Sequence, residues 1–322
     1  MAKLIKSLIV LLSIVSSSPI IAIFASPLIV GYYNDQCPDA ESIISGVVAS
    51  ATSSNSRVPA QLLRLHFHDC FVTGCDGSIL IDNGPNSERN AEAHRGLGGF
   101  DVIDAAKAQL EAACPGVVSC SDILALATRD GIVLSNGPSY DVPTGRRDGT
   151  VSDVSSVTDF PDVDDPIDTL RYKFASRGFD DKGLVLLSAS HTIGTAACFF
   201  MTNRLYNFSP DSPSDPTINP AFINELQSIC PQGGDVEVRQ AIDHGSEFTF
   251  DRSIFQNMRD GFAVLASDAR IYEDGSTGSM VNYFLDGTTF EDEYKAAIVN
   301  LGQVGVLAGY DGEIRQVCSS FN

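Results

Sequence analysis

The chain has 322 residues and a formal net charge of −20, with a sequence pI of about 4.4. Such acidity repels nucleic acid and anionic membrane surfaces, and it suits neutral or cationic small substrates. It is equally well explained as the charge that keeps an extracellular protein soluble. The length is enough for one large domain or for two lobes that share a core.

The N-terminus has the pattern of a secretory signal peptide. Lys3 and Lys6 precede an apolar run over residues 8–15, and small residues surround a cleavage point after Ala25. Residues 1–25 are therefore predicted to be removed. A membrane anchor is the alternative, but serines and Pro19 interrupt the run before the roughly 20 apolar residues that a span needs.

Helical periodicity recurs in the rest of the chain, whereas clear alternating strands are scarce. Apolar residues spaced three and four apart predict helices over 99–114, 121–134 and 292–304. A further helix is predicted to open at Pro166 and to end near Gly178. The fold is therefore predicted to be mostly α-helical.

Long loops connect the predicted helices, and loops of this length carry function or need tying down by disulfides or ions. They cover residues 82–98, 135–166, 207–220 and 231–253. No linker marks a domain boundary, so residues 26–322 are predicted to form a single domain.

All eight cysteines follow the predicted signal peptide. They are Cys37, Cys70, Cys75, Cys114, Cys120, Cys198, Cys230 and Cys318. An even number in an exported chain predicts four disulfides, although spacing alone does not assign the pairs. Buried thiols or a metal cluster are alternatives, but no two cysteines have the CxxC spacing of a zinc site.

Residues 57–80 hold the strongest candidate for chemistry. On a helix, Arg64 and His68 lie one turn apart on the same face. An imidazole that moves a proton, beside a fixed positive charge, is what cleavage of a peroxide O–O bond needs. His66 and His68 also allow a metal hydrolase, but alternate residues on a helix diverge. A lone helical histidine is more often structural.

Two other segments carry weaker signals. Residues 69–78 offer carboxylate, hydroxyl and carbonyl oxygens on a tight loop, which suits Ca²⁺ as well as it suits a solvated acidic turn. His191 ends the apolar run 184–190. A histidine there is as compatible with hydrogen-bonded core as with the axial ligand of a haem iron.

The sequence Arg64-Leu-His-Phe-His-Asp-Cys-Phe-Val-x-Gly-Cys-Asp-Gly-Ser78, together with Ser190-His-Thr-Ile-Gly194, resembles the two haem motifs of class III secretory plant peroxidases. The resemblance extends from about Tyr33 to the C-terminus. It implies an all-α fold in which a distal and a proximal lobe enclose one haem b. It also implies that the protein reduces hydrogen peroxide and oxidises phenolic donors in one-electron steps.

The resemblance assigns roles to individual residues. Arg64 and His68 would be the catalytic pair, with Phe67 against the haem and Arg57 near its propionates. His191 would bind the iron, and Asp268 would hydrogen-bond the far nitrogen of His191. The remaining assignments are Pro161 and Phe200 at the donor edge, the buried ion pair Asp122–Arg146, a distal Ca²⁺ on Asp69, Val72, Gly74, Asp76 and Ser78, and a proximal Ca²⁺ on Thr192, Asp243, Ser246, Thr249 and Asp251. The implied disulfides are Cys37–Cys114, Cys70–Cys75, Cys120–Cys318 and Cys198–Cys230.

The chain departs from the family pattern in the loop that contains Glu88. The family usually has an asparagine here that bonds the distal histidine, and His94 occupies its place. An imidazole nitrogen can accept the same bond. The chain also has no tryptophan, which excludes a tryptophan radical and a surface tryptophan for bulky donors.

The predicted enzyme is a secreted monomer. Only four residues follow Cys318, so a C-terminal vacuolar extension is not expected and the apoplast or cell wall is the predicted location. Asn207-Phe208-Ser209 is a glycosylation sequon weakened by Pro210. A catalytically silent wall protein on the same scaffold and a haem-free metal hydrolase are the rival functions.

Overall fold

A computed structural model describes residues 28–322, so the predicted signal peptide lies outside the described residues. Within them the fold is α-helical, as predicted, with one short sheet. The α-helices are α1 Ala40–Ser54, α2 Val58–Val72, α3 Phe100–Ala113, α4 Cys120–Leu134, α5 Ile167–Ala175, α6 Asp181–Ser188, α7 Thr202–Leu205, α8 Pro220–Ile229, α9 Ser253–Asp260, α10 Ala266–Glu273, α11 Gly275–Asp286 and α12 Phe290–Leu301. The helices predicted over 99–114, 121–134, 166–178 and 292–304 are α3, α4, α5 and α12.

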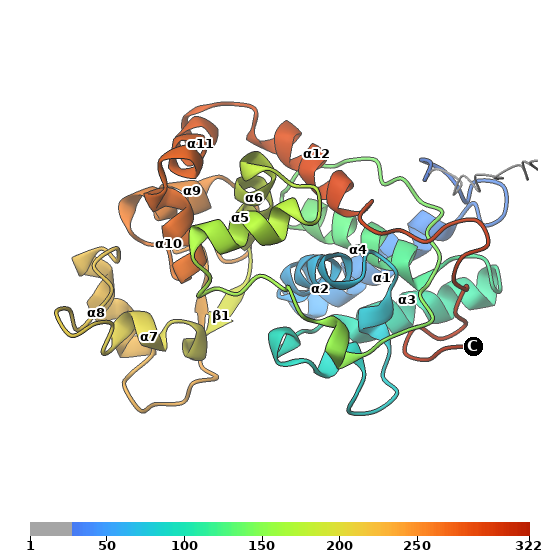
Figure 1. The fold of residues 1–322 in the computed structure, drawn as a ribbon. Helices are drawn as coiled ribbons and strands as arrows, with labels where there is room; N and C mark the ends of the chain where they lie inside the picture. The colour runs from blue at the N-terminus through green and yellow to red at the C-terminus, as the bar shows by residue number, and fades with distance from the viewer. Residues whose placement is uncertain (1–27) are drawn as a thin grey trace, which may run out of the picture.

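The N-terminal half packs around α4, whose apolar residues are buried on nearly every side. The side chain of Ser119 caps this helix by accepting the N–H of Asp122 at 3.1 Å. Helices α1, α2 and α3 contact it and share one apolar core. Figure 1 shows these four helices together on one side of the molecule.

A second core joins the opposite side of α2 to the C-terminal half. Leu63 and Phe71 of α2 pack there with apolar residues of α5, α6, α9, α11 and α12. A smaller cluster covers α7 and α8, at the far end of the molecule in Figure 1. Helix α2 therefore lies between the two halves, with one side in each core.

The sheet pairs β1 (Thr195–Ala197) with β2 (Arg239–Ala241) in antiparallel register, with Ala197 opposite Arg239. Strand β1 begins three residues after the 3-10 helix η5 (Ala189–Thr192), which contains His191 and continues directly from α6. Strand β2 lies within the segment 231–253 that was predicted as a loop. This strand pairing therefore holds that segment against the chain that follows His191.

Four disulfides tie the fold together, and they are the four pairs that the resemblance implied: Cys37–Cys114, Cys70–Cys75, Cys120–Cys318 and Cys198–Cys230. The third closes 198 residues and draws the C-terminal tail back onto the N-terminal half. Cross-links of this kind contribute about 2–4 kcal/mol each. No helix among residues 28–322 is both long and apolar enough to cross a membrane.

Candidate functional site

Helix α2 places Arg64 and His68 one turn apart on one face. Nδ1 of His68 lies 2.7 Å from Nδ1 of His94, so one ring donates to the other. Nε2 of His68 has no hydrogen-bond partner among the described residues. Burial lowers the pKa of His68 well below its usual value, and the charges of Arg64 and His94 lower it further. His68 is therefore a neutral imidazole with one unpaired nitrogen.

His94 and Glu88 continue inward from His68. Both are buried, in the 3-10 helices η3 (Glu92–His94) and η2 (Glu88–Asn90). Burial lowers the pKa of His94 to about 4, and it raises the pKa of Glu88 to about 8. When the neutral His94 accepts the bond at Nδ1, its proton sits on Nε2, which faces Glu88 Oε1 at 3.9 Å. This tautomer leaves Nε2 of His68 free to act as a base.

Arg64 donates from Nη2 to the carbonyl of Arg95 at 3.1 Å and meets no carboxylate within ion-pair distance in the described residues. Burial, together with the charge of Arg239, lowers its pKa to about 10. The charge of Arg64 also acts to lower the pKa of both His68 and His191. Arg64 is therefore close enough to influence both imidazoles.

On the proximal side, His191 is held by Asp268 of α10. Nδ1 of His191 lies 2.9 and 3.1 Å from the two carboxylate oxygens. Desolvation lowers the pKa of His191, but the charge and hydrogen bond of Asp268 together outweigh this, so the net pKa is raised. Asp268 is completely buried, whereas 34% of the His191 side chain is exposed.

The partial exposure of His191 differs from the buried position that its apolar run indicated. The run ends with α6 at Ser188, and His191 lies on the tighter turn of η5, which directs its ring out of the core. Its Nε2 has no partner among the described residues. An accessible nitrogen, with the opposite nitrogen bonded to a buried carboxylate, has the arrangement of a metal-ligating histidine.

Aromatic rings line the space beside His68. The ring of Phe160 lies 4.4 Å from that of His68 and 5.7 Å from that of Phe67, measured between centroids. Pro161 follows directly and is half-buried. Sequence analysis missed Phe160, although its position next to Pro161 was a usable signal. These rings form an apolar wall beside the ring of His68.

His66 points away from this group. Its Nδ1 lies 3.7 Å from Sγ of Cys70, in the disulfide, and its neighbours are Gly302 and Arg146. His68 instead contacts His94 and Phe160. The two histidines diverge, which is the behaviour expected of alternate residues on a helix.

The acidic loop that follows α2 gathers Asp69, Asp76 and Glu88 in the interior. Asp69 Oδ2 accepts the N–H of Gly77 at 3.0 Å, while Oδ1 is buried with no partner among the described residues. Burial raises the pKa of Asp69 well above its usual value, and repulsion from Asp76 and Glu88 raises it further. An orphaned carboxylate oxygen beside two other acids favours a bound cation.

The other predicted distal ligands lie in the same loop. Asp76 Oδ1 accepts the N–H of Ser78 at 3.0 Å, and the carbonyl of Val72 accepts from Arg177 at 2.7 Å. Gly74 has a φ of +119°, and a Cβ there would approach the backbone of Gly305 to 2.6 Å. Only glycine therefore suits this turn.

A second acidic cluster lies beside His191 and joins all five residues predicted for the proximal ion. The hydroxyl of Thr192 lies 3.2 Å from Asp243 Oδ2 and 3.5 Å from the carbonyl of Thr249, and Ser246 donates to Asp251 Oδ2 at 2.6 Å. Burial raises the pKa of Asp243 to about 6. Ser253 and Asn257 also donate to Asp243, which the sequence did not reveal.

Neither acidic cluster contains three side chains of His, Cys, Asp or Glu around a single point, and residues 28–322 hold no such group elsewhere. The donors are carboxylates mixed with hydroxyl and carbonyl oxygens. This donor set is typical of Ca²⁺ and unlike the nitrogen and sulfur donors of zinc.

Phe200 and Arg57 are the two remaining predicted site residues. The ring of Phe200 lies tilted against that of Phe199, 4.2 Å apart between centroids, and Phe199 in turn lies 5.0 Å beneath the guanidinium of Arg95. Arg57 is exposed at the N-terminus of α2, and its charge acts on Arg239.

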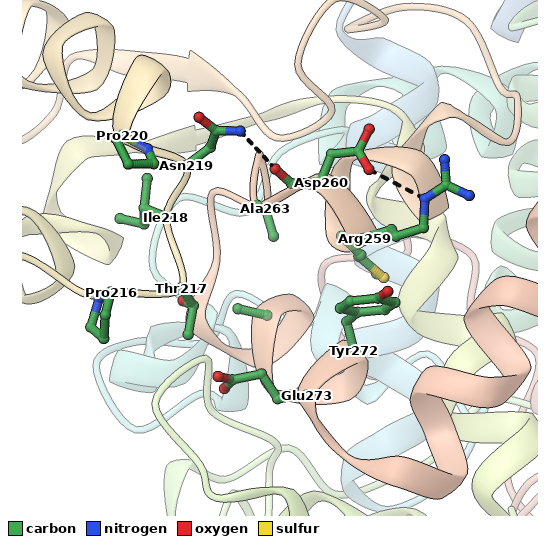
Figure 2. Close-up of a pocket in the computed structure, with 13 residues that line it drawn as sticks. Pro216, Thr217, Ile218, Asn219, Pro220, Arg259, Asp260, Ala263, Tyr272 and Glu273 are labelled. Carbon is green, nitrogen blue, oxygen red and sulfur yellow. Dashed lines mark hydrogen bonds and ion pairs between the residues drawn. The ribbon is translucent and has the colours of Figure 1, made fainter.

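Figure 2 shows a separate pocket of about 380 Å³ between the start of α8, the end of α9 and α10. Residues 216–220, Arg259 and Tyr272 line it. It contains none of the predicted site residues, and neither does a second pocket between α6 and α12. We assign no role to either.

Comparison with known proteins identifies the class. The peroxidase family profile matches residues 44–287, which include both motifs and every residue predicted for catalysis, haem, Ca²⁺ and the donor. The chain therefore belongs to the peroxidase family, within which it is of the plant secretory type.

Individual relatives agree. The chain is 58% identical to Peroxidase 43 of Arabidopsis thaliana, with 91% of this chain and 92% of that protein aligned. It is 49% identical to Peroxidase 13 of the same species, with 92% and 94% aligned, and 47% identical to Peroxidase N1 of Nicotiana tabacum, with 91% and 90% aligned. The protein is a peroxidase, and its family implies haem, hydrogen peroxide and an electron donor.

Proposed function

We propose that this peroxidase binds one haem b between His191 and His68 and uses hydrogen peroxide to oxidise phenolic donors. One observation carries the proposal. His191 from η5 and His68 from α2 each have Nδ1 hydrogen-bonded to a neighbour and Nε2 free. The charge of Arg64 acts to lower the pKa of both imidazoles.

The residues present suit a haem. Nε2 of His191 would bind the iron, and the bond to Asp268 would raise the electron density of that ring. Phe67 and Phe160 would cover the porphyrin on the distal side, and Arg57 would lie near a propionate. When bound, the haem supplies the redox chemistry of O–O cleavage and of electron uptake from donors.

The distal side chains would handle the proton and the charge. His68 would take a proton from the near oxygen of the peroxide at its free Nε2 and return it to the leaving oxygen. His94, supported by Glu88, would hold the tautomer in which this nitrogen is free. Arg64 would stabilise the negative charge that develops on the leaving oxygen. Phenolic donors would approach past Pro161 and Phe200.

Purified protein tests this proposal directly. We expect a strong haem absorption band and peroxide-dependent oxidation of guaiacyl and syringyl phenols that zinc chelators do not inhibit. Haem-replete protein that oxidises no donor would support the silent scaffold instead. Haem-free protein with chelator-sensitive hydrolysis would support the metal enzyme. A comparison of phenols with auxin-like donors would identify the preferred class.

We further propose two Ca²⁺ ions, one on each acidic cluster. Chelation is expected to lower the melting temperature by about 5–10 °C. A ligand present at about 100 times its Kd adds roughly 2.7 kcal/mol to the free energy of unfolding, and in a large domain each kcal/mol corresponds to about 2–4 °C. Elemental analysis should find two ions in the wild type and one in Asp243→Asn. Two ions in that variant would refute the proximal site. A melting temperature that chelation leaves unchanged would refute both sites.

We propose that residues 26–322 form one domain, exported to the apoplast or cell wall after loss of residues 1–25, and active as a monomer. The four disulfides support export, since such bonds persist in oxidising compartments.

A further inference from the structure

Three guanidinium groups form a cluster of like charge beside the two imidazoles. This arginine cluster consists of Arg57, Arg64 and Arg239. Burial and then the charge of Arg239 lower the pKa of Arg64, and burial and then the charge of Arg57 lower the pKa of Arg239. No carboxylate of the described residues lies within ion-pair distance of any of the three.

The pairing of β1 with β2 explains how Arg239 reaches this place. Arg239 lies opposite Ala197 in the register of β1 and β2, so its side chain shares a face with Ala197 and Thr195. It donates from Nε to the hydroxyl of Thr195 at 2.7 Å and from Nη2 to the carbonyl of Thr195 at 2.5 Å. Thr195 is four residues from His191, so these bonds hold Arg239 close to the proximal histidine in the chain.

The nearest acid on this segment has another partner. Glu237, two residues before Arg239, forms an ion pair with Arg95, whose guanidinium lies over the ring of Phe199. This pair links the loop after η3 to the segment that carries β2. Glu237 is thereby held by Arg95. Its charge acts to raise the pKa of Arg239, but burial and the charge of Arg57 outweigh this effect and the net pKa is lowered.

Like charges held close together are unfavourable without a counter-charge. This chain carries 41 acidic residues against 21 Lys and Arg, yet the cluster recruits none of those acids as an ion-pair partner. Planar guanidinium groups pair best with carboxylates, in two parallel hydrogen bonds. The arrangement therefore suits an external carboxylate.

We propose that Arg239, together with Arg57, binds a haem propionate carboxylate; this inference rests on the haem assignment made above. The sequence offered no signal for Arg239, because its position depends on the pairing of β1 with β2. A carboxylate on the donor molecule is the other source of the same chemistry.

Esterified haem separates these two sources. The holoenzyme would be prepared with haem or with haem dimethyl ester, and the rate of transfer to excess apomyoglobin would be followed by absorbance. With ordinary haem, Arg239→Gln is expected to transfer about five- to tenfold faster than the wild type, the size of one partly exposed charged hydrogen bond. With the dimethyl ester, the variant and the wild type should transfer at similar rates. Arg239→Lys should fall between the wild type and Arg239→Gln.

Arg259→Gln is the matched control, because it removes one positive charge at the pocket of Figure 2 and should transfer haem at the wild-type rate. Equal transfer from Arg239→Gln and wild type with ordinary haem would overturn the inference. A raised KM for a carboxylated phenol alone, with transfer unchanged, would assign Arg239 to the donor and also overturn it. Failure of the wild type to bind haem would instead overturn the proposed function.

Discussion

Replacing His68 by alanine is expected to slow the reaction with hydrogen peroxide by about two to four orders of magnitude, the usual contribution of a positioned acid–base group. The haem band should remain, because the proposed iron ligand is His191 on a different element. Stopped-flow mixing of the haem-loaded variant with peroxide measures the rate directly. The expected loss is large because His68 is the neutral distal imidazole whose Nε2 is free, whereas the neighbouring His94 is already bonded through its Nδ1.

His244→Gln serves as the control for this experiment. Its side chain is 34% exposed and paired with Glu225. Its substitution should leave the rate unchanged. A His68→Ala enzyme that reacts as fast as the wild type would show that the proton is moved by another group.

The second large effect concerns stability. Asp122→Ala is expected to lower the free energy of unfolding by about 3–5 kcal/mol, because it leaves the buried guanidinium of Arg146 without its counter-ion. Asp122 accepts from Arg146 Nη1 at 2.7 Å, from the hydroxyl of Tyr33 at 2.6 Å and from the N–H of Gly145 at 2.7 Å. All of these donors would lose their acceptor together.

Denaturant unfolding of Asp122→Ala and of Glu293→Ala measures this effect. Glu293 pairs with Lys182 at 3.0 Å, and both side chains are at least one-third exposed. Removing an exposed pair should cost less than about 1 kcal/mol. Equal losses in the two variants would contradict the importance given to the buried pair.

Much of the fold could be predicted from local pattern. Helices α3, α4 and α12 show in the sequence because their apolar spacing is set by the period of the helix itself. The face shared by Arg64 and His68 follows from the same period. Disulfide pairing does not follow from spacing, and only the family resemblance supplied it.

Other parts of the site depend on contacts between distant segments. The outward turn of His191 arises because α6 gives way to η5, and Phe160 meets His68 only after a long loop has folded back. Ser253 and Asn257 reach Asp243 from α9. The position of Arg239 depends on the pairing of β1 with β2, and a three-residue strand is too short to be predicted from its own sequence.

The return of the C-terminal tail has a consequence for biosynthesis. Arg315 is fully buried in the N-terminal half, where it donates to the carbonyls of Gly77 and Gly149, and Cys318 bonds to Cys120. Domains often fold from the N-terminus while the ribosome is still adding residues. Here the first half to be translated is completed only by contacts with Arg315 and Cys318, so its folding must wait until that late segment has been translated.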